Sequence, residues 1–154
     1  MPARMRLLAI SVIVSATASL AADIRISDLQ DIDFGTVPPT AGQLVRTMDF
    51  CVSLDKTGQY SVIARGTGVA EAFTLNNGAW ELPYTLRYSD TPGASGTLLT
   101  PGFPEAGFRA KKRKKNVDCN KPSASIEVTI ESADLQAAGP GQYRGQLTLT
   151  VTPE

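Results

Sequence analysis

Hydrophobic and polar residues alternate along residues 142–152 of this 154-residue chain. A period of two is typical of a β-strand with one buried face, because successive side chains of a strand point to opposite faces. The buried face is predicted to carry Tyr143, Leu147, Leu149 and Val151. Because the printed chain stops soon after Val151, we expect no later strand to cover the free edge of this one.

Similar patterns recur through the body of the chain. Further strands are expected at residues 29–37, 44–54, 59–64, 82–89 and 123–132. Within 44–54, Arg46 interrupts the apolar face, and a β-bulge would reconcile the pattern. Residues 90–107 are rich in proline and glycine and are expected to form a loop, and 134–141 a turn. About seven strands without a long helical period predict an all-β, immunoglobulin-like sandwich.

The first 21 residues have the pattern of a secretory signal peptide. Arg4 and Arg6 form a basic start, residues 7–14 form an apolar run, and small residues follow. Ser19 and Ala21 suit positions −3 and −1 of a cut before Ala22, which leaves one domain at 22–154. The alternative, a buried N-terminal helix, lacks a polar face and a cap. The apolar run is too short to span a bilayer, and no later segment is predicted to span one.

The charge balance argues against general affinity for nucleic acid or anionic membranes. The chain has 15 basic and 15 acidic residues, and loss of Arg4 and Arg6 leaves 13 and 15. The resulting net charge of −2 provides no broad basic surface.

Cys51 and Cys119 are the two cysteines of the chain, and histidine is absent. An exported chain meets an oxidising compartment, where an even cysteine count indicates a disulfide. A metal site would need more ligands, and a nucleophilic cysteine would need a histidine base. We therefore expect a Cys51–Cys119 disulfide.

Six basic residues fall within residues 109–115: Arg109, Lys111, Lys112, Arg113, Lys114 and Lys115. Nucleic-acid binding would need aromatic side chains interleaved with the charges, and only Phe108 borders the run. Two interpretations remain open. One is a solvated loop beside Cys119, and the other is a docking surface for an anionic partner such as lipopolysaccharide phosphates or an acidic face of another subunit.

Other candidate features favour structural roles. Asp28, Asp31 and Asp33 do not have the spacing of a calcium loop and are expected to be exposed. Trp80 is expected in the core, with an exposed aromatic for ligand stacking as the alternative. No spacing of acidic or basic groups singles out a catalytic pair, so we expect no catalytic, cofactor-binding or metal-binding residues.

Four local patterns together resemble the spore coat protein U family, which includes pilins of the archaic chaperone–usher pathway. They are DFGTV at 33–37, FCVSLDKTGQYSV at 50–62, LPYTLRYSD at 82–90 and AGPGQYRGQLTLTV at 138–151. In this order and spacing the resemblance covers nearly all of residues 22–154.

The resemblance implies a non-enzymatic structural or adhesive pilus subunit, exported to the periplasm and then to the cell surface. In such subunits the sandwich lacks its last strand, and a groove is left open. A periplasmic chaperone fills this groove first, and the N-terminal extension of another subunit fills it in the fibre, with an outer-membrane usher as a further partner. This is β-strand addition. The resemblance places Tyr143, Leu147, Leu149 and Val151 in the groove wall.

The N-terminal region departs from the family pattern. Fibre-forming members begin with a long alternating donor segment and a cysteine, whereas only residues 22–28 precede the first expected strand here. Ile24 and Ile26 alternate, but a donor strand needs about ten residues. The sequence thus indicates a minor or tip-proximal subunit or a relative that does not polymerise. The alternative function is a self-contained exported binding module that uses the basic run or Trp80.

Overall fold

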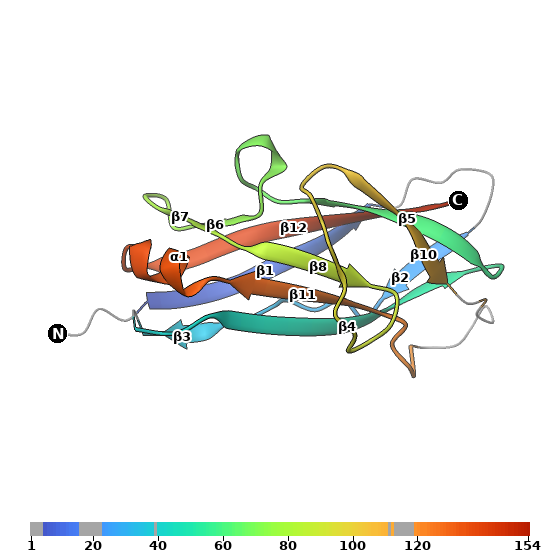
Figure 1. Cartoon of the computed structure of the whole chain (residues 1–154), viewed down its shortest axis with the longest axis horizontal. Coiled ribbons are helices and arrows are strands. Elements are labelled where there is room, and N and C mark those ends of the chain that lie inside the picture. Colours follow the sequence, from blue (N-terminus) through green and yellow to red (C-terminus); the bar gives the residue numbers. More distant parts are fainter. Residues whose placement is uncertain (1–4, 16–22, 39, 111, 113–118) are drawn as a thin grey trace.

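The computed structural model describes residues 5–15, 23–38, 40–110, 112 and 119–154. The chain is built almost entirely from strands in two layers that run along the long axis of the molecule (Figure 1). This confirms the all-β sandwich predicted from the alternating patterns. The strands are β1 (Met5–Ser15), β2 (Ile24–Ser27), β3 (Gly35–Val37), β4 (Leu44–Leu54), β5 (Gly58–Arg65), β6 (Thr74–Asn76), β7 (Glu81–Pro83), β8 (Thr85–Ser89), β9 (Thr97–Leu98), β10 (Pro104–Ala110), β11 (Ala124–Ile130) and β12 (Gln142–Pro153).

The strands form two sheets. The seven-stranded sheet has the order β10-β5-β12-β1-β3, with β6 joined to β12 and β7 joined to β6. The five-stranded sheet has the order β2-β4-β11-β8-β9. Among the registered pairs of the described strands, all are antiparallel except that of β1 with β12, which is parallel.

The inward faces of both sheets pack into one hydrophobic core. On β11, Ile126 and Val128 are fully buried, and on β12 Leu147 and Leu149 are fully buried, as the alternation predicts. Burial of a side chain of this size contributes about 1.5–3 kcal/mol. The predicted inward faces of the two most regular strands are therefore confirmed, whereas Ser125 on the opposite face of β11 is also buried.

Residues 82–89 keep their predicted alternation but form two strands. Leu82, Leu86 and Tyr88 are fully buried. Between them the chain passes from β7 in one sheet to β8 in the other, and the Tyr84 N–H donates to the Phe73 carbonyl at 3.0 Å. Because inward residues stay inward across this change of sheet, the sequence pattern does not reveal it.

The bulge expected at Arg46 is wrong. β4 pairs with β11 in an unbroken register from Leu44↔Ile130 to Phe50↔Ala124. Arg46 is accommodated because this end of β4 is exposed, and its guanidinium carbon lies 5.8 Å from the centre of the Phe34 ring. The aromatic face attracts the cation, so a charge fits on an otherwise apolar face.

Two segments expected to be irregular contain regular structure. Residues 104–110 form β10, where Gly107 with φ +85° interrupts the register between Glu105 and Phe108 and hides the alternation. Residues 132–137 form helix α1 instead of the start of a turn. This helix buries Leu135, and it is too short to show a helical period in the sequence.

The first expected strand, 29–37, is regular only in β3. The Asp33 carboxylate accepts a hydrogen bond from the Gly35 N–H at 2.7 Å, and Gly35 has φ +70°. This conformation favours glycine at the first residue of β3. The glycine of the DFGTV pattern thus has a local backbone role.

Candidate strand-accepting site

β12 lies inside its sheet and has neighbours along both edges. On one edge it pairs with β5 from Thr148↔Arg65 to Pro153↔Tyr60, and with β6 at Arg144↔Asn76. On the other edge it pairs with β1 from Arg6↔Gln142 to Ser15↔Thr150. The expectation of an uncovered edge is therefore wrong for the chain that includes residues 5–15, because β1 covers that edge.

The four residues predicted to line a groove are all buried. Tyr143, Leu147 and Leu149 are fully buried and stand in register with β1, and Val151 lies just beyond the last β1–β12 pair. The Tyr143 hydroxyl donates to the Gly139 carbonyl at 2.8 Å, which fixes the start of β12 against the preceding loop. The side chains thus face the core next to the position that β1 occupies.

β3 and the residues before it bound the other side of this position. β1 pairs antiparallel with β3 from Met5↔Val37 to Leu7↔Gly35, and Ile10 bridges to Ile32 through two hydrogen bonds of 3.0 and 3.3 Å. Ile32, Phe34 and Val37 are buried. The site is therefore the space between β12 and β3, and it is one strand wide.

The sequence reasoning treated residues 5–15 only as a leader and missed their place in the sheet. Their signal is the segment ISVIV at 10–14, in which four of the five residues are β-branched and apolar, and it suits a buried strand as well as a leader. Ile10 is fully buried, Val12 packs partly buried against the core, and Ile13 is 46% exposed. Inward and outward positions thus alternate along residues 10–13 of β1.

β2 belongs to the chain's own fold. It pairs antiparallel with β4 from Ile24↔Leu54 to Ser27↔Cys51. Ile24 and Ile26 pack partly buried against the core. These residues therefore do not form a free donor arm in this structure.

The predicted disulfide is present. Cys51 on β4 and Cys119 are bonded, with their Cα atoms 5.9 Å apart. Asp28 lies close to both sulfur atoms, but both sulfurs are used in the disulfide, so this cluster does not form a metal site. The bond fits the oxidising compartment that the leader predicts.

The basic run is described in part. Arg109 is exposed on β10, and its backbone N–H donates to the Asp90 carboxylate at 2.7 Å. Lys112 is exposed and forms an isolated bridge with Leu54. The run therefore begins on a strand, whereas Lys111, Arg113, Lys114 and Lys115 lie outside the described residues.

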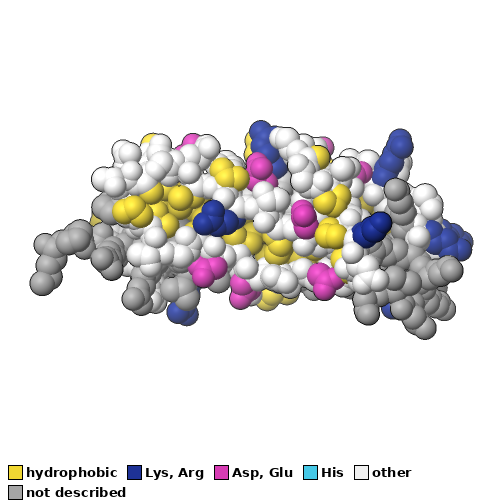
Figure 2. All heavy atoms as spheres, turned by 90° about the horizontal axis from the view of Figure 1, so that it is seen from below, with side chains coloured by type: hydrophobic (Ala, Val, Ile, Leu, Met, Phe, Trp, Pro, Cys, Tyr) yellow, Lys and Arg dark blue, Asp and Glu magenta, His cyan; other side chains and the backbone are white. Residues whose placement is uncertain are grey.

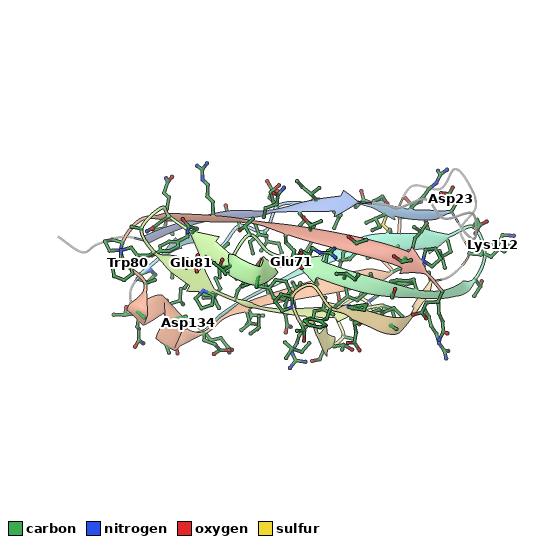
Figure 3. All side chains as sticks on the ribbon, turned by 90° about the horizontal axis from the view of Figure 1, so that it is seen from above. Asp23, Glu71, Trp80, Glu81, Lys112 and Asp134 are labelled. Carbon is green, nitrogen blue, oxygen red and sulfur yellow. A yellow bond between two sulfur atoms is a disulfide. The ribbon has the colours of Figure 1, made fainter. Side chains whose placement is uncertain are left out.

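Trp80 is not in the core, contrary to the prediction. Its side chain is 53% exposed and packs so closely on Gly139 that a Cβ atom there would lie 2.6 Å from the indole nitrogen. Figure 3 places Trp80 at one end of the long axis and Lys112 at the other. Trp80 and Lys112 therefore do not lie in one binding site.

The aspartates near β3 are exposed, as predicted: Asp28, Asp31 and Asp33. On the face shown in Figure 2, acidic and basic side chains are scattered among hydrophobic ones. This mixture agrees with the nearly balanced charge of the sequence.

Two buried tyrosines share a hydrogen bond inside the core. The hydroxyls of Tyr60 and Tyr88 lie 2.8 Å apart, and the Tyr88 ring packs edge-on to Phe108 at 4.6 Å between centroids. Burial raises the pKa of Tyr60 to about 12 and the pKa of Tyr88 well above its ordinary value. These shifts follow from packing in the core, where a substrate has no access to the hydroxyls.

In the part of the chain that the structure describes, no helix is long and apolar enough to cross a membrane. Comparisons of the sequence with protein-family models and with curated proteins found no match.

Proposed function

We propose that this chain is a non-enzymatic, exported subunit of a chaperone–usher fibre, with a structural or adhesive role near the tip or another minor position. Its site accepts a β-strand between β12 and β3. The observation that carries the proposal is that β1, residues 5–15, occupies this site. The sequence predicts that these residues are removed as a leader.

Removal of this leader would expose two strand edges at once. The edge of β12 would lose its registered partners from Gln142 to Thr150, and β3 would lose its partners from Gly35 to Val37. Unpaired strand edges next to an apolar core bind extended segments of other chains. The resemblance to spore coat protein U subunits supplies the partners: a periplasmic chaperone, an outer-membrane usher and other pilus subunits.

The proposed function is tested by supplying a strand to the processed chain. Residues 22–154 are produced alone and with a donor segment of a family fibre subunit fused after Glu154 through a short flexible linker. The fusion makes pairing intramolecular, at roughly millimolar effective concentration. A matched control fusion carries charged residues in place of the inward apolar residues of the donor.

The donor fusion is expected to be monomeric and to melt at least 10 °C above the unfused chain, whereas the control fusion is not stabilised. Equal melting temperatures for all three proteins, with the added tail cut readily by protease, would contradict the proposal.

A second function, a self-contained binding module, is favoured by the exposed indole of Trp80. An exposed aromatic ring held on the backbone at Gly139 can stack on a flat or sugar-like ligand. This function requires a stable monomer without any donor strand, so the same fusion experiment separates the two.

A further inference from the structure

β1 completes the seven-stranded sheet of its own chain. It inserts between β12 and β3, pairing with β12 from Arg6 to Ser15 and with β3 from Met5 to Leu7. Figure 1 shows it running beside β12 in the same direction. The β12 edge at this position is therefore paired within a single chain, and Ile10 adds a bridge to Ile32 on the other side.

The side chains of β1 fit the site as well as its backbone. The Ile10 side chain is fully buried in the core, and the Ile10 backbone forms a bridge with Ile32. Val12 packs against the same core, whereas the Ile13 side chain on the outer face of β1 is 46% exposed. A strand that only touched an edge would not bury an isoleucine completely.

β1 is joined to β2 by a short segment, so its pairing with β12 and β3 is intramolecular. Residues 16–23 separate the end of β1 from the start of β2. A short tether gives the attached segment a high effective concentration, so a free strand from another chain competes poorly with it.

We propose that the leader is the first strand donor of this chain. Residues 5–15 occupy the site before processing, and their removal opens it to a strand from a partner. This inference rests on the proposed strand-accepting function and adds its regulation: an unprocessed chain is closed, and cleavage before Ala22 makes it able to assemble.

The closed state links assembly to export. A chain that still carries its leader has no vacant strand position between β12 and β3. Such a chain has no free β12 edge to offer to a donor strand. Only the processed chain would then need a chaperone.

The test uses the full chain, refolded in vitro under oxidising conditions without any processing enzyme. Ile10→Asp places a charge at a fully buried position of β1, and Ile13→Asp places the same charge at an exposed position of the same strand. The probe is a labelled peptide with the sequence of residues 5–15 and a lysine tail for solubility.

Wild type and Ile13→Asp are expected to leave the peptide unbound, because the site is occupied. Ile10→Asp is expected to bind it at least tenfold more tightly and to lose most of the melting-temperature difference between residues 1–154 and 22–154. Equal peptide binding and equal melting temperatures for the two variants would overturn the inference.

A cysteine pair tests the parallel register without depending on the stability of Ile10→Asp. Ser11 stands opposite Gln146, so Ser11→Cys with Gln146→Cys should crosslink readily under mild oxidation. Ser11→Cys with Thr150→Cys is the matched control, since Thr150 stands opposite Ser15. Absence of any preference for the first pair would also overturn the inference.

The donor fusion described for residues 22–154 separates this inference from the function on which it rests. Stabilisation by the fused donor, with no effect of Ile10→Asp on the full chain, would reject the leader as a donor and retain the strand-accepting site. Failure of both the fused donor and the leader to stabilise the fold would reject both.

Discussion

The hydroxyl groups of Tyr60 and Tyr84 are both buried, but they differ in hydrogen bonding. Tyr60 bonds to Tyr88, whereas the Tyr84 hydroxyl has no hydrogen-bond partner among the described residues. A buried polar group without a partner costs free energy, and one that loses its partner costs about 1–3 kcal/mol. The two residues therefore predict opposite results for the same chemical change.

Tyr60→Phe is expected to lower the free energy of unfolding by about 1–3 kcal/mol, because it leaves the Tyr88 hydroxyl unpaired in the core. Tyr84→Phe is expected to leave stability within about 0.5 kcal/mol or to raise it, because it removes a group that has no partner. Urea unfolding of the two variants and the wild type measures both values. A larger loss for Tyr84→Phe than for Tyr60→Phe would contradict this account of the core.

Stability is expected to fall at alkaline pH. Burial is the largest cause of the raised pKa of Tyr60, about 12 against an ordinary value of 10.0. The unfolded state therefore releases this proton at lower pH than the folded state does. The contribution of the neutral hydroxyl is complete below pH 10 and is lost as pH rises from 10 to about 12.

The difference of about two pKa units corresponds to roughly 3 kcal/mol at most. Tyr84 and Tyr88, whose pKa values burial also raises, act in the same direction. Melting temperatures measured from pH 8 to pH 12 should decline above pH 10, and less steeply for Tyr60→Phe. A flat profile up to pH 12 would contradict the burial of these hydroxyls.

At the scale of the element, the sequence predicted strands best where one strand stays in one sheet. On β12 the buried residues were named correctly, and on β11 Ile126, Val128 and Ile130 are buried on one face, although Ser125 on the other face is buried too. β10 was missed because a left-handed glycine, Gly107, disturbs its register, and α1 was missed because six residues are too few for a helical period. In these segments tertiary contacts decide the structure, and a local pattern contains little information about them.

The candidate site shows the same limit. The four wall residues on β12 could be named from alternation and from the family resemblance, and all four are buried. The strand beside them could not be named, because parallel pairing of β1 with β12 joins residues about 135 positions apart (Arg6 with Gln142, for example) and leaves no local signal. Trp80 was placed wrongly because its contact with Gly139 depends on a loop that is also distant in sequence.

The basic run is expected to be dispensable for folding. Replacement of Lys111, Lys112, Arg113, Lys114 and Lys115 by Ser should change the free energy of unfolding by less than about 1 kcal/mol, because isolated surface charges contribute little. The same variant should lose salt-sensitive binding to lipopolysaccharide if the run docks an anionic partner. A fall of several degrees in melting temperature would show instead that the run supports the fold.

At the scale of the whole molecule, the seven-stranded sheet includes β1, which lies in the segment that the sequence predicts to be a removable leader. β12 has β5 and β6 along one edge and β1 along the other, and β1 also closes the sheet against β3. Residues 145–147 are the most direct reporters of this arrangement. In the registered pairs of the described strands, their partners are Ile10, Ser11 and Val12 of β1 alone.

The measurement that tests this most directly is amide hydrogen exchange at residues 145–147, with the amides of β11 as an internal reference. It compares residues 22–154 alone with the same residues carrying the donor segment after Glu154. The account predicts fast exchange at 145–147 in the chain alone and protection increased by about 100-fold or more with the donor, which corresponds to roughly 2.7 kcal/mol of added local stability. Strong protection at 145–147 in residues 22–154 alone, unchanged by the donor, would mean that the sheet is complete without an added strand and would contradict the strand-accepting site.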